Sequence, residues 1–151
     1  MTLVRFLRVL TVAAVLTAVA CDEKLSDVTG PTPNLEPTFA SISQHIFQTT
    51  DSAGRTGCTQ CHTTAGGRVP PLGLSLDPGA AYGNLVNVTS RQKPELMRVA
   101  PGNPDASYLV HKLEGRADIV GQRMPRTSGP FLTEGQMMVI RRWIALGAPN
   151  N

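Results

Sequence analysis

The sequence predicts a small all-α domain that is rich in loops. Apolar residues recur at helical spacing in three stretches, which predict helices over 38–48, 104–114 and 133–146. Strand patterns are poorly supported along the whole chain. The 14 Gly, the 12 Pro and the low 17% of charged residues argue against a coiled coil or a long helical repeat. A length of 151 residues suits one domain.

The first twenty residues have the pattern of a signal peptide. Arg5 and Arg8 precede an apolar run from Leu10 to Leu16, and Ala18-Val19-Ala20 is a small-residue cleavage site. The apolar run is too short for a membrane-spanning anchor. We therefore expect export to the periplasm or cell envelope, with residues 1–20 removed from the mature protein.

Cys21 directly follows the predicted cleavage site. The segment from Leu16 to Cys21 resembles a bacterial lipoprotein signal, in which the Cys becomes the lipidated first residue. Ordinary cleavage after Ala20 is the alternative, and it would leave a free thiol in an oxidising compartment. We expect lipidation of Cys21, which would anchor the protein to a membrane.

Removal of the signal peptide also changes the charge. It takes away Arg5 and Arg8 and no acidic residue, so the formal net charge falls from +3 to +1. That excess is too small to indicate a nucleic-acid partner.

Residues 21–36 are predicted to form a flexible tether, because they are polar and include Gly30-Pro31-Thr32-Pro33. The domain is predicted to span 37–151. Its first helix presents Phe39, Ile42 and Ile46 on one face. A short helical turn is expected around 79–86.

The ends of the later helices carry clear signals. Asn103 is a predicted N-cap, and Gly115 a predicted stop, for the helix over 104–114. Thr133 and Gln136 form a predicted capping box at the start of the last helix.

Cys58-Thr59-Gln60-Cys61-His62 has the spacing of a c-type haem attachment site. Two thiols three positions apart can each add to one vinyl group of a single haem, and the adjacent His62 is then delivered to the iron. Export agrees with this chemistry, because bacteria attach such haem outside the cytoplasm. The helices are therefore expected to pack around one haem c, held through Cys58 and Cys61.

Three other interpretations of this motif have less support from the sequence. A structural zinc site normally takes four protein ligands, and beyond Cys21 and the motif only His45 and His111 remain. A thioredoxin-like redox pair expects a βαβ setting, which the sequence does not show. A disulfide between Cys58 and Cys61 would close a tiny loop and stabilise little.

The second axial ligand has several candidates, and two methionines on the last helix have clearer packing roles. Met137 lies on the core face of that helix, whereas Met138 lies about 100° further round and is expected at the periphery. His111 lies opposite the apolar face of its helix and is expected in solvent.

Met124 is the best candidate for this ligand. It lies in a loop punctuated by Gly and Pro, where a thioether can be presented to iron more easily than from a packed helix face. Met97, His45, His111 and an open iron position remain as alternatives.

The chain resembles small bacterial cytochrome c domains of the planctomycete and acidobacterial type over roughly residues 38–149. The matching segments are the Cys58–His62 motif, Gly73-Leu74-Ser75-Leu76, Ala81-Tyr82-Gly83-Asn84-Leu85-Val86, the run from Val99 to Leu109, Arg123-Met124-Pro125 and the run from Trp143 to Pro149. The resemblance implies a helical cytochrome c fold with His62 and Met124 as axial ligands.

Two axial ligands would leave the iron no open position, so the expected function is electron transfer and not enzymatic catalysis. The expected partners are redox proteins of the cell envelope. An accessory or sensor module docked on a membrane dehydrogenase or oxidase is the alternative, and a peroxidase-like enzyme is a further one. We also expect His62 to hydrogen-bond the carbonyl of Pro70 or Pro71, since ligating histidines usually donate their other ring N–H.

Overall fold

Helices and short turns form the described part of the chain, and its only β-structure is isolated bridges. The computed structural model describes residues 30, 32, 34–126 and 129–151. The predicted signal peptide and Cys21 lie outside these residues. The all-α fold class is confirmed for the described residues. The helices are α3 (Phe39–Ile42), the π-helical η1 (Ser43–Gln48), α4 (Ala81–Leu85), α5 (Tyr108–Glu114) and α6 (Glu134–Ala145), with single turns η2 (Cys58–Gln60), η3 (Ala65–Gly67), η4 (Pro71–Gly73) and η5 (Pro104–Ala106).

The start of α6 has the predicted capping box. The Thr133 hydroxyl accepts a hydrogen bond from the Gln136 N–H at 3.2 Å, and the Gln136 side chain accepts one from the Thr133 N–H at 3.0 Å. Two of the free N–H groups at the helix start are thereby satisfied. The apolar face of α6 is buried through Met137, Ile140 and Ile144.

The helix predicted over 104–114 is divided into η5 and α5. Asn103 caps η5 through its side chain, and Gly115 ends α5 in a left-handed conformation, as the sequence indicates. Ser107 between them has an extended backbone. Its hydroxyl donates to the Asn103 carbonyl and accepts from the Ala100 N–H, each at 2.9 Å. The side chain thus competes with the helical hydrogen-bond pattern at this residue.

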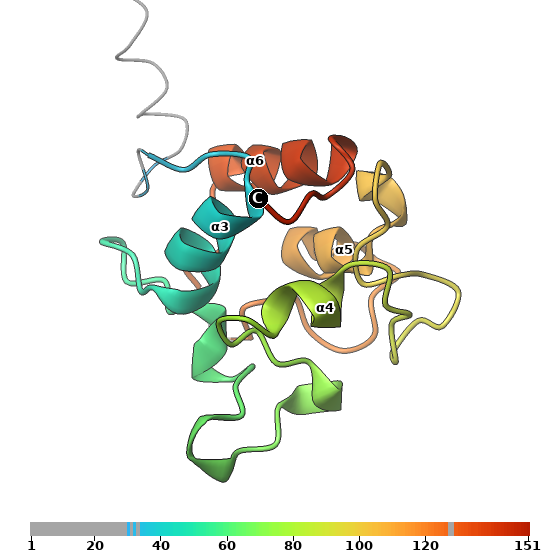
Figure 1. The fold of residues 1–151 in the computed structure, drawn as a ribbon, viewed down its shortest axis with the longest axis horizontal. Helices are drawn as coiled ribbons and strands as arrows, with labels where there is room; N and C mark the ends of the chain where they lie inside the picture. Colours follow the sequence, from blue (N-terminus) through green and yellow to red (C-terminus); the bar gives the residue numbers. More distant parts are fainter. Residues whose placement is uncertain (1–29, 31, 33, 127–128) are drawn as a thin grey trace, which may run out of the picture.

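The core lies between α6 on one side and the elements α3, α4 and α5 on the other (Figure 1). Three aromatic rings meet within it: the ring of Phe39 has its centroid 5.1 Å from that of Tyr82 and 5.7 Å from that of Trp143. Trp143 is fully buried, and so are Ile42, Ile46, Phe47, Leu85, Val99, Val110, Ile140 and Ile144.

The end of the predicted tether is part of the folded domain, which corrects the sequence prediction. Leu35 is buried in the core, and the Thr32 hydroxyl accepts a hydrogen bond from the Gln136 side chain at 3.1 Å. Gly30 lies against Thr133. The tether prediction for 21–36 is therefore wrong from about Thr32 onward, because composition alone does not reveal a tertiary contact with α6.

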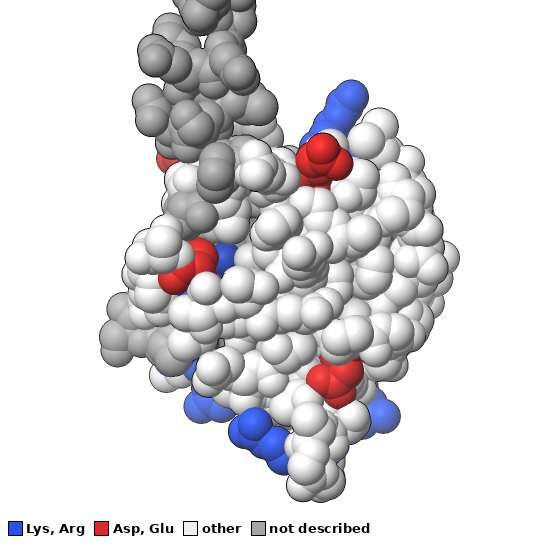
Figure 2. Space-filling view, turned by 60° about the vertical axis from the view of Figure 1, so that its left-hand side comes forward, with Lys and Arg blue, Asp and Glu red and all other residues white. Residues whose placement is uncertain are grey.

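Charged side chains are sparse on the face shown in Figure 2, where Lys and Arg gather along the lower edge. Among the described residues, none of the helices has the length and apolar character needed to cross a bilayer.

Candidate functional site

The Cys-x-x-Cys-His motif is folded into one tight turn. The carbonyl of Cys58 accepts hydrogen bonds from the Cys61 N–H at 3.1 Å and from the His62 N–H at 2.9 Å. This turn, η2, docks on η1, since the Thr59 hydroxyl donates to the Phe47 carbonyl at 3.1 Å. A Cβ on Gly57 would lie 2.8 Å from the backbone carbon of Gln48, so this close approach needs glycine.

The two thiols of the motif have different surroundings. Cys58 packs against the core, with its Sγ 3.7 Å from the Ile46 carbonyl, whereas Cys61 is exposed. Burial raises the pKa of the Cys58 thiol to about 11, although the nearby Arg55 charge opposes this shift. Both thiols are free. One thiol thus faces the interior and the other the surface, and both belong to the same turn.

The imidazole of His62 is oriented by the chain that follows it. Its Nδ1 lies 3.1 Å from the carbonyl oxygen of Leu74, and an Nδ1–H that donates there leaves the lone pair on Nε2. Burial, opposed by this hydrogen bond, lowers the pKa of His62, and the charge of Arg98 lowers it further. The neutral form with Nε2 unprotonated is the form that binds a metal.

The prediction that the His62 ring bonds the carbonyl of Pro70 or Pro71 is wrong. Around η4, the Pro70 carbonyl accepts from the Gly73 N–H at 3.0 Å, and the Pro71 carbonyl accepts from the Leu74 N–H at 3.1 Å. Both carbonyls are therefore engaged in their own turn. The kind of acceptor, a backbone carbonyl of the loop after the motif, is confirmed, but the residue is Leu74.

Two arginines near this loop were not predicted as site residues. Arg98 is buried, and its guanidinium donates to the Asn84 carbonyl at 2.7 Å and to the Leu72 carbonyl at 3.1 Å. The guanidinium of Arg91 packs against Gly73. Burial, and then the charge of Arg91, lower the pKa of Arg98. No carboxylate of the described residues lies within ion-pair distance of either guanidinium.

Met124 is half-buried and packs against the same core cluster as Cys58 and Leu74. Its segment is fastened to α5 by backbone and side-chain hydrogen bonds. The Met124 N–H donates to the Lys112 carbonyl at 2.8 Å, and the Lys112 ammonium donates to the carbonyls of Val120 at 2.9 Å and Gln122 at 2.6 Å. The predicted ligand loop is thus held in place by a buried lysine that the sequence analysis did not single out.

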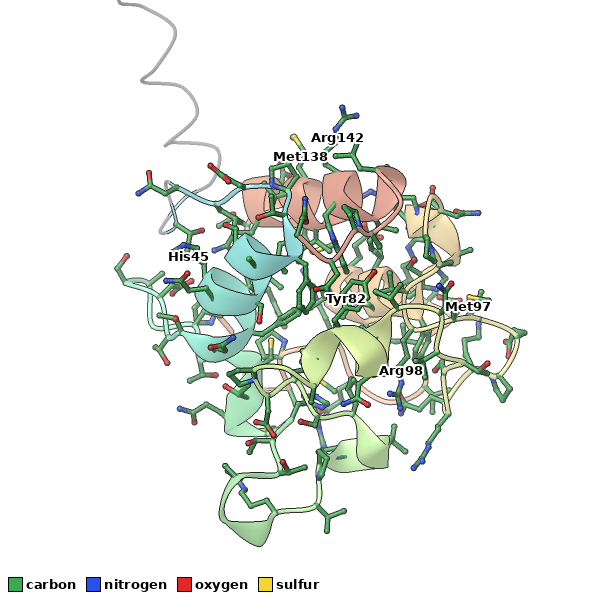
Figure 3. The ribbon with its side chains drawn as sticks, in the orientation of Figure 1. His45, Tyr82, Met97, Arg98, Met138 and Arg142 are labelled. Carbon is green, nitrogen blue, oxygen red and sulfur yellow. The ribbon has the colours of Figure 1, made fainter. Side chains whose placement is uncertain are left out.

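Met137 and Met138 lie where the sequence analysis predicts. Met137 is 8% exposed and belongs to the core, whereas Met138 is 60% exposed. Met97 is 42% exposed. Figure 3 shows Met97 and Met138 at the periphery of the molecule, and His45 on the outer side of the segment that carries η1. None of these three side chains shares the position of Met124 against the core.

His111 corrects a sequence prediction, because it is buried and not in solvent. Its Nδ1 lies 3.0 Å from an oxygen of Asp118, and its Nε2 lies 2.7 Å from the Asp105 carbonyl. The loop after α5 folds back to supply Asp118, which a helical wheel cannot show. Since both ring nitrogens have hydrogen-bond partners, His111 has a structural role in this fold.

No set of three or more His, Cys, Asp or Glu side chains gathers into a metal site within the part of the chain that the structure describes. No protein-family model matches the chain, and no curated protein or solved structure matches it. The resemblance to cytochrome c domains therefore remains an expectation, and the function is argued from the site itself.

Proposed function

We propose that this protein is an exported c-type cytochrome that carries single electrons through one haem bound covalently to Cys58 and Cys61. The observation that carries the proposal is the arrangement of His62. Its Nδ1 is bonded to the Leu74 carbonyl, so its Nε2 lone pair is available, and the same tight turn holds two free thiols. A ligating histidine is usually oriented in this way by a partner on its other nitrogen.

The residues present suit haem c by their chemistry. Cys58 and Cys61 would hold the porphyrin through thioethers, His62 would be one axial ligand, and Met124 the other. The haem would supply a redox-active iron, and a thioether ligand favours the ferrous state relative to a second imidazole. Met124 is half-buried against the core and belongs to a fastened loop, which suits a lasting ligand better than an exposed side chain.

Positive charge around the loop that follows the motif also supports haem as the bound group. Haem carries two carboxylates, and Arg98 and Arg91 provide positive charge without a carboxylate partner among the described residues. A buried cation without a counter-charge is unfavourable unless a polar or anionic group compensates it. The backbone carbonyls of Asn84 and Leu72 compensate Arg98 in part.

Electron transfer fits this site better than catalysis. If His62 and Met124 both held the iron, no coordination position would be left for a substrate. The proposed partners are redox proteins of the cell envelope, and lipidated Cys21 would hold the domain on a membrane.

The test is covalent haem in protein exported by a bacterium that attaches haem to secreted chains. Haem should remain with the polypeptide in acid-acetone, and a reduced-minus-oxidised spectrum should show sharp bands of low-spin haem c. The double change Cys58→Ala/Cys61→Ala should abolish attachment. Cys21→Ser, which removes the third cysteine, should not. Wild-type protein that loses all its haem to acid-acetone, or never carries any, would refute the proposal.

A further inference from the structure

Two chain segments, 62–64 and 74–77, lie side by side next to the imidazole of His62. The His62 carbonyl accepts a hydrogen bond from the Leu76 N–H at 2.8 Å, while its ring bonds the Leu74 carbonyl at 3.1 Å. Between the segments runs the loop 65–73, whose residues are mostly exposed. The two hydrogen bonds therefore form part of the base of a long surface loop.

The carboxylate of Asp77 closes that base. One oxygen accepts from the Thr64 N–H at 2.7 Å, from the Thr64 hydroxyl at 2.8 Å and from the Ser75 hydroxyl at 2.8 Å. The other oxygen accepts from the Thr63 hydroxyl. Four donors from both segments thus converge on one side chain.

These contacts lie next to the hydrogen bond between His62 and Leu74. Thr63 directly follows His62 in the sequence, and Ser75 directly follows Leu74. The Ser75 backbone is held further by the Asn84 side chain, which donates to its carbonyl at 3.0 Å. A shift of Leu74 away from His62 would therefore strain the hydrogen bonds that Ser75 makes with Asp77 and Asn84.

We propose that Asp77 is a positioning residue for His62, because its carboxylate fixes the Leu74 carbonyl at the distance that orients the imidazole toward iron. The inference rests on the proposed function, since it concerns the ligand geometry of the haem. Asp77 does not touch the reacting atoms and acts through the two segments that it joins.

The ionisation of Asp77 agrees with this role. Hydrogen bonds from Thr63, and then those from Thr64 and Ser75, hold the pKa of the Asp77 carboxyl far below its ordinary range. The side chain is therefore an ionised acceptor at neutral pH. Charge-assisted hydrogen bonds of this kind are stronger than those between neutral groups.

The experiment compares the holoprotein with its Asp77→Ala variant. The ring N–H of His62 is followed by ¹⁵N NMR in the diamagnetic ferrous state, where it should exchange slowly with water in wild type. In Asp77→Ala this exchange should be faster by on the order of tenfold, the size of effect expected when hydrogen bonds to a charged group are lost. The low-spin spectrum should also be lost at a higher pH on acidification.

Asp105→Asn is the matched control. It removes another hydrogen-bonded carboxylate, which is exposed, bonds Arg116 and Arg141 and makes no hydrogen bond with His62. Ring N–H exchange should stay at the wild-type rate in this variant. An equal acceleration in Asp105→Asn would show a general loss of stability and would overturn the positioning role.

Two milder variants guard against misfolding of Asp77→Ala. Thr64→Ala removes one donor and keeps the carboxylate, and Asp77→Asn keeps one acceptor oxygen. Both should give intermediate exchange rates with unchanged far-ultraviolet circular dichroism. Wild-type exchange in all three variants would overturn the inference alone, provided that haem content is normal. Wild-type protein without covalent haem would overturn the proposed function as well.

Discussion

Met124 differs from the other described methionines in the way it is buried. Met137 is buried on α6, and Met97 and Met138 are exposed, whereas Met124 is half-buried on a loop against the core. A ligand must reach the metal and still be shielded from water. Among these four side chains, Met124 best meets both conditions.

Met124→Ala should leave the haem attached to Cys58 and Cys61 and remove the sixth ligand. The iron should become high-spin or bind water, the reduction potential should fall, and carbon monoxide or cyanide should gain access. The weak near-infrared Met–iron band should disappear. Survival of that band in Met124→Ala, together with its loss in Met97→Ala, would assign the ligand to Met97.

Met137→Ala and Met138→Ala are the matched controls for this change. Met137→Ala should lower the free energy of unfolding by about 2–5 kcal/mol, because a buried side chain is truncated. Its near-infrared band should stay. Met138→Ala, on the exposed face of α6, should change neither quantity appreciably.

Among the elements, the contact between α5 and the 120–124 segment depends on Lys112. Lys112→Met keeps an unbranched apolar chain and removes the ammonium, which leaves the carbonyls of Val120 and Gln122 without this donor. We expect a loss of about 1–3 kcal/mol in unfolding free energy and a weaker Met–iron band. Chemical denaturation and near-infrared absorption measure the two effects.

Lys93→Met is the control for Lys112. Lys93 pairs with Asp118 nearer the surface and does not bond the segment 120–124. Its removal should leave the Met–iron band intact. A weakened band in Lys93→Met, or an unchanged one in Lys112→Met, would contradict the role assigned to Lys112.

Elements with local signals could be predicted from the sequence. The capping box of α6, the Asn103 cap and the Gly115 stop depend on residues within four positions of each other, and all three are present. The interruption at Ser107 and the burial of Leu35 depend on contacts with distant residues or on a side chain that competes with the helix.

The same distinction applies to the candidate site. The Cys58–His62 turn is local, and its spacing reveals it. The Leu74 carbonyl, the buried Arg98 and the Asp118 partner of His111 are brought in by loops, whose course no periodicity encodes. The sequence therefore predicts candidate iron ligands more readily than the contacts that orient them.

At the scale of the whole molecule, acid should destabilise the fold through its paired surface carboxylates. Hydrogen bonds from Arg116 and Arg141 lower the pKa of Asp105, and a hydrogen bond from Lys93 lowers that of Asp118. A folded-state pKa below the unfolded value gives stability that is present above about pH 4 and is lost as the pH falls through the folded value. Melting temperature should therefore begin to drop as the pH falls below about 4.

Asp105→Asn tests whether Asp105 contributes to the loss of melting temperature at low pH. The variant should melt lower than wild type at neutral pH and lose less on acidification, because its contribution is already absent. Parallel melting curves for the two proteins across this pH range would rule out Asp105 as a source of the acid sensitivity.

The predicted membrane anchor at Cys21 also concerns the whole molecule. Thr32 already packs on α6, so the tether predicted over 21–36 cannot act as a leash over its whole length. Cys21→Ser should move the protein from the membrane fraction to the soluble fraction. Wild-type protein that is soluble with an unmodified Cys21 would instead support ordinary cleavage after Ala20.

The closed base of the loop 65–73 has a consequence for limited proteolysis. Arg68 is exposed, and the next residue, Val69, is 90% exposed, so trypsin can reach the bond between them. The bonds from Asp77 to Thr63 and Thr64 and from Leu76 to His62 lie beyond both ends of this loop. A nicked molecule should therefore migrate as one particle on a native gel and separate into two fragments only in denaturant. Haem stain would then accompany the amino-terminal fragment, although the carboxyl-terminal fragment contains Met124.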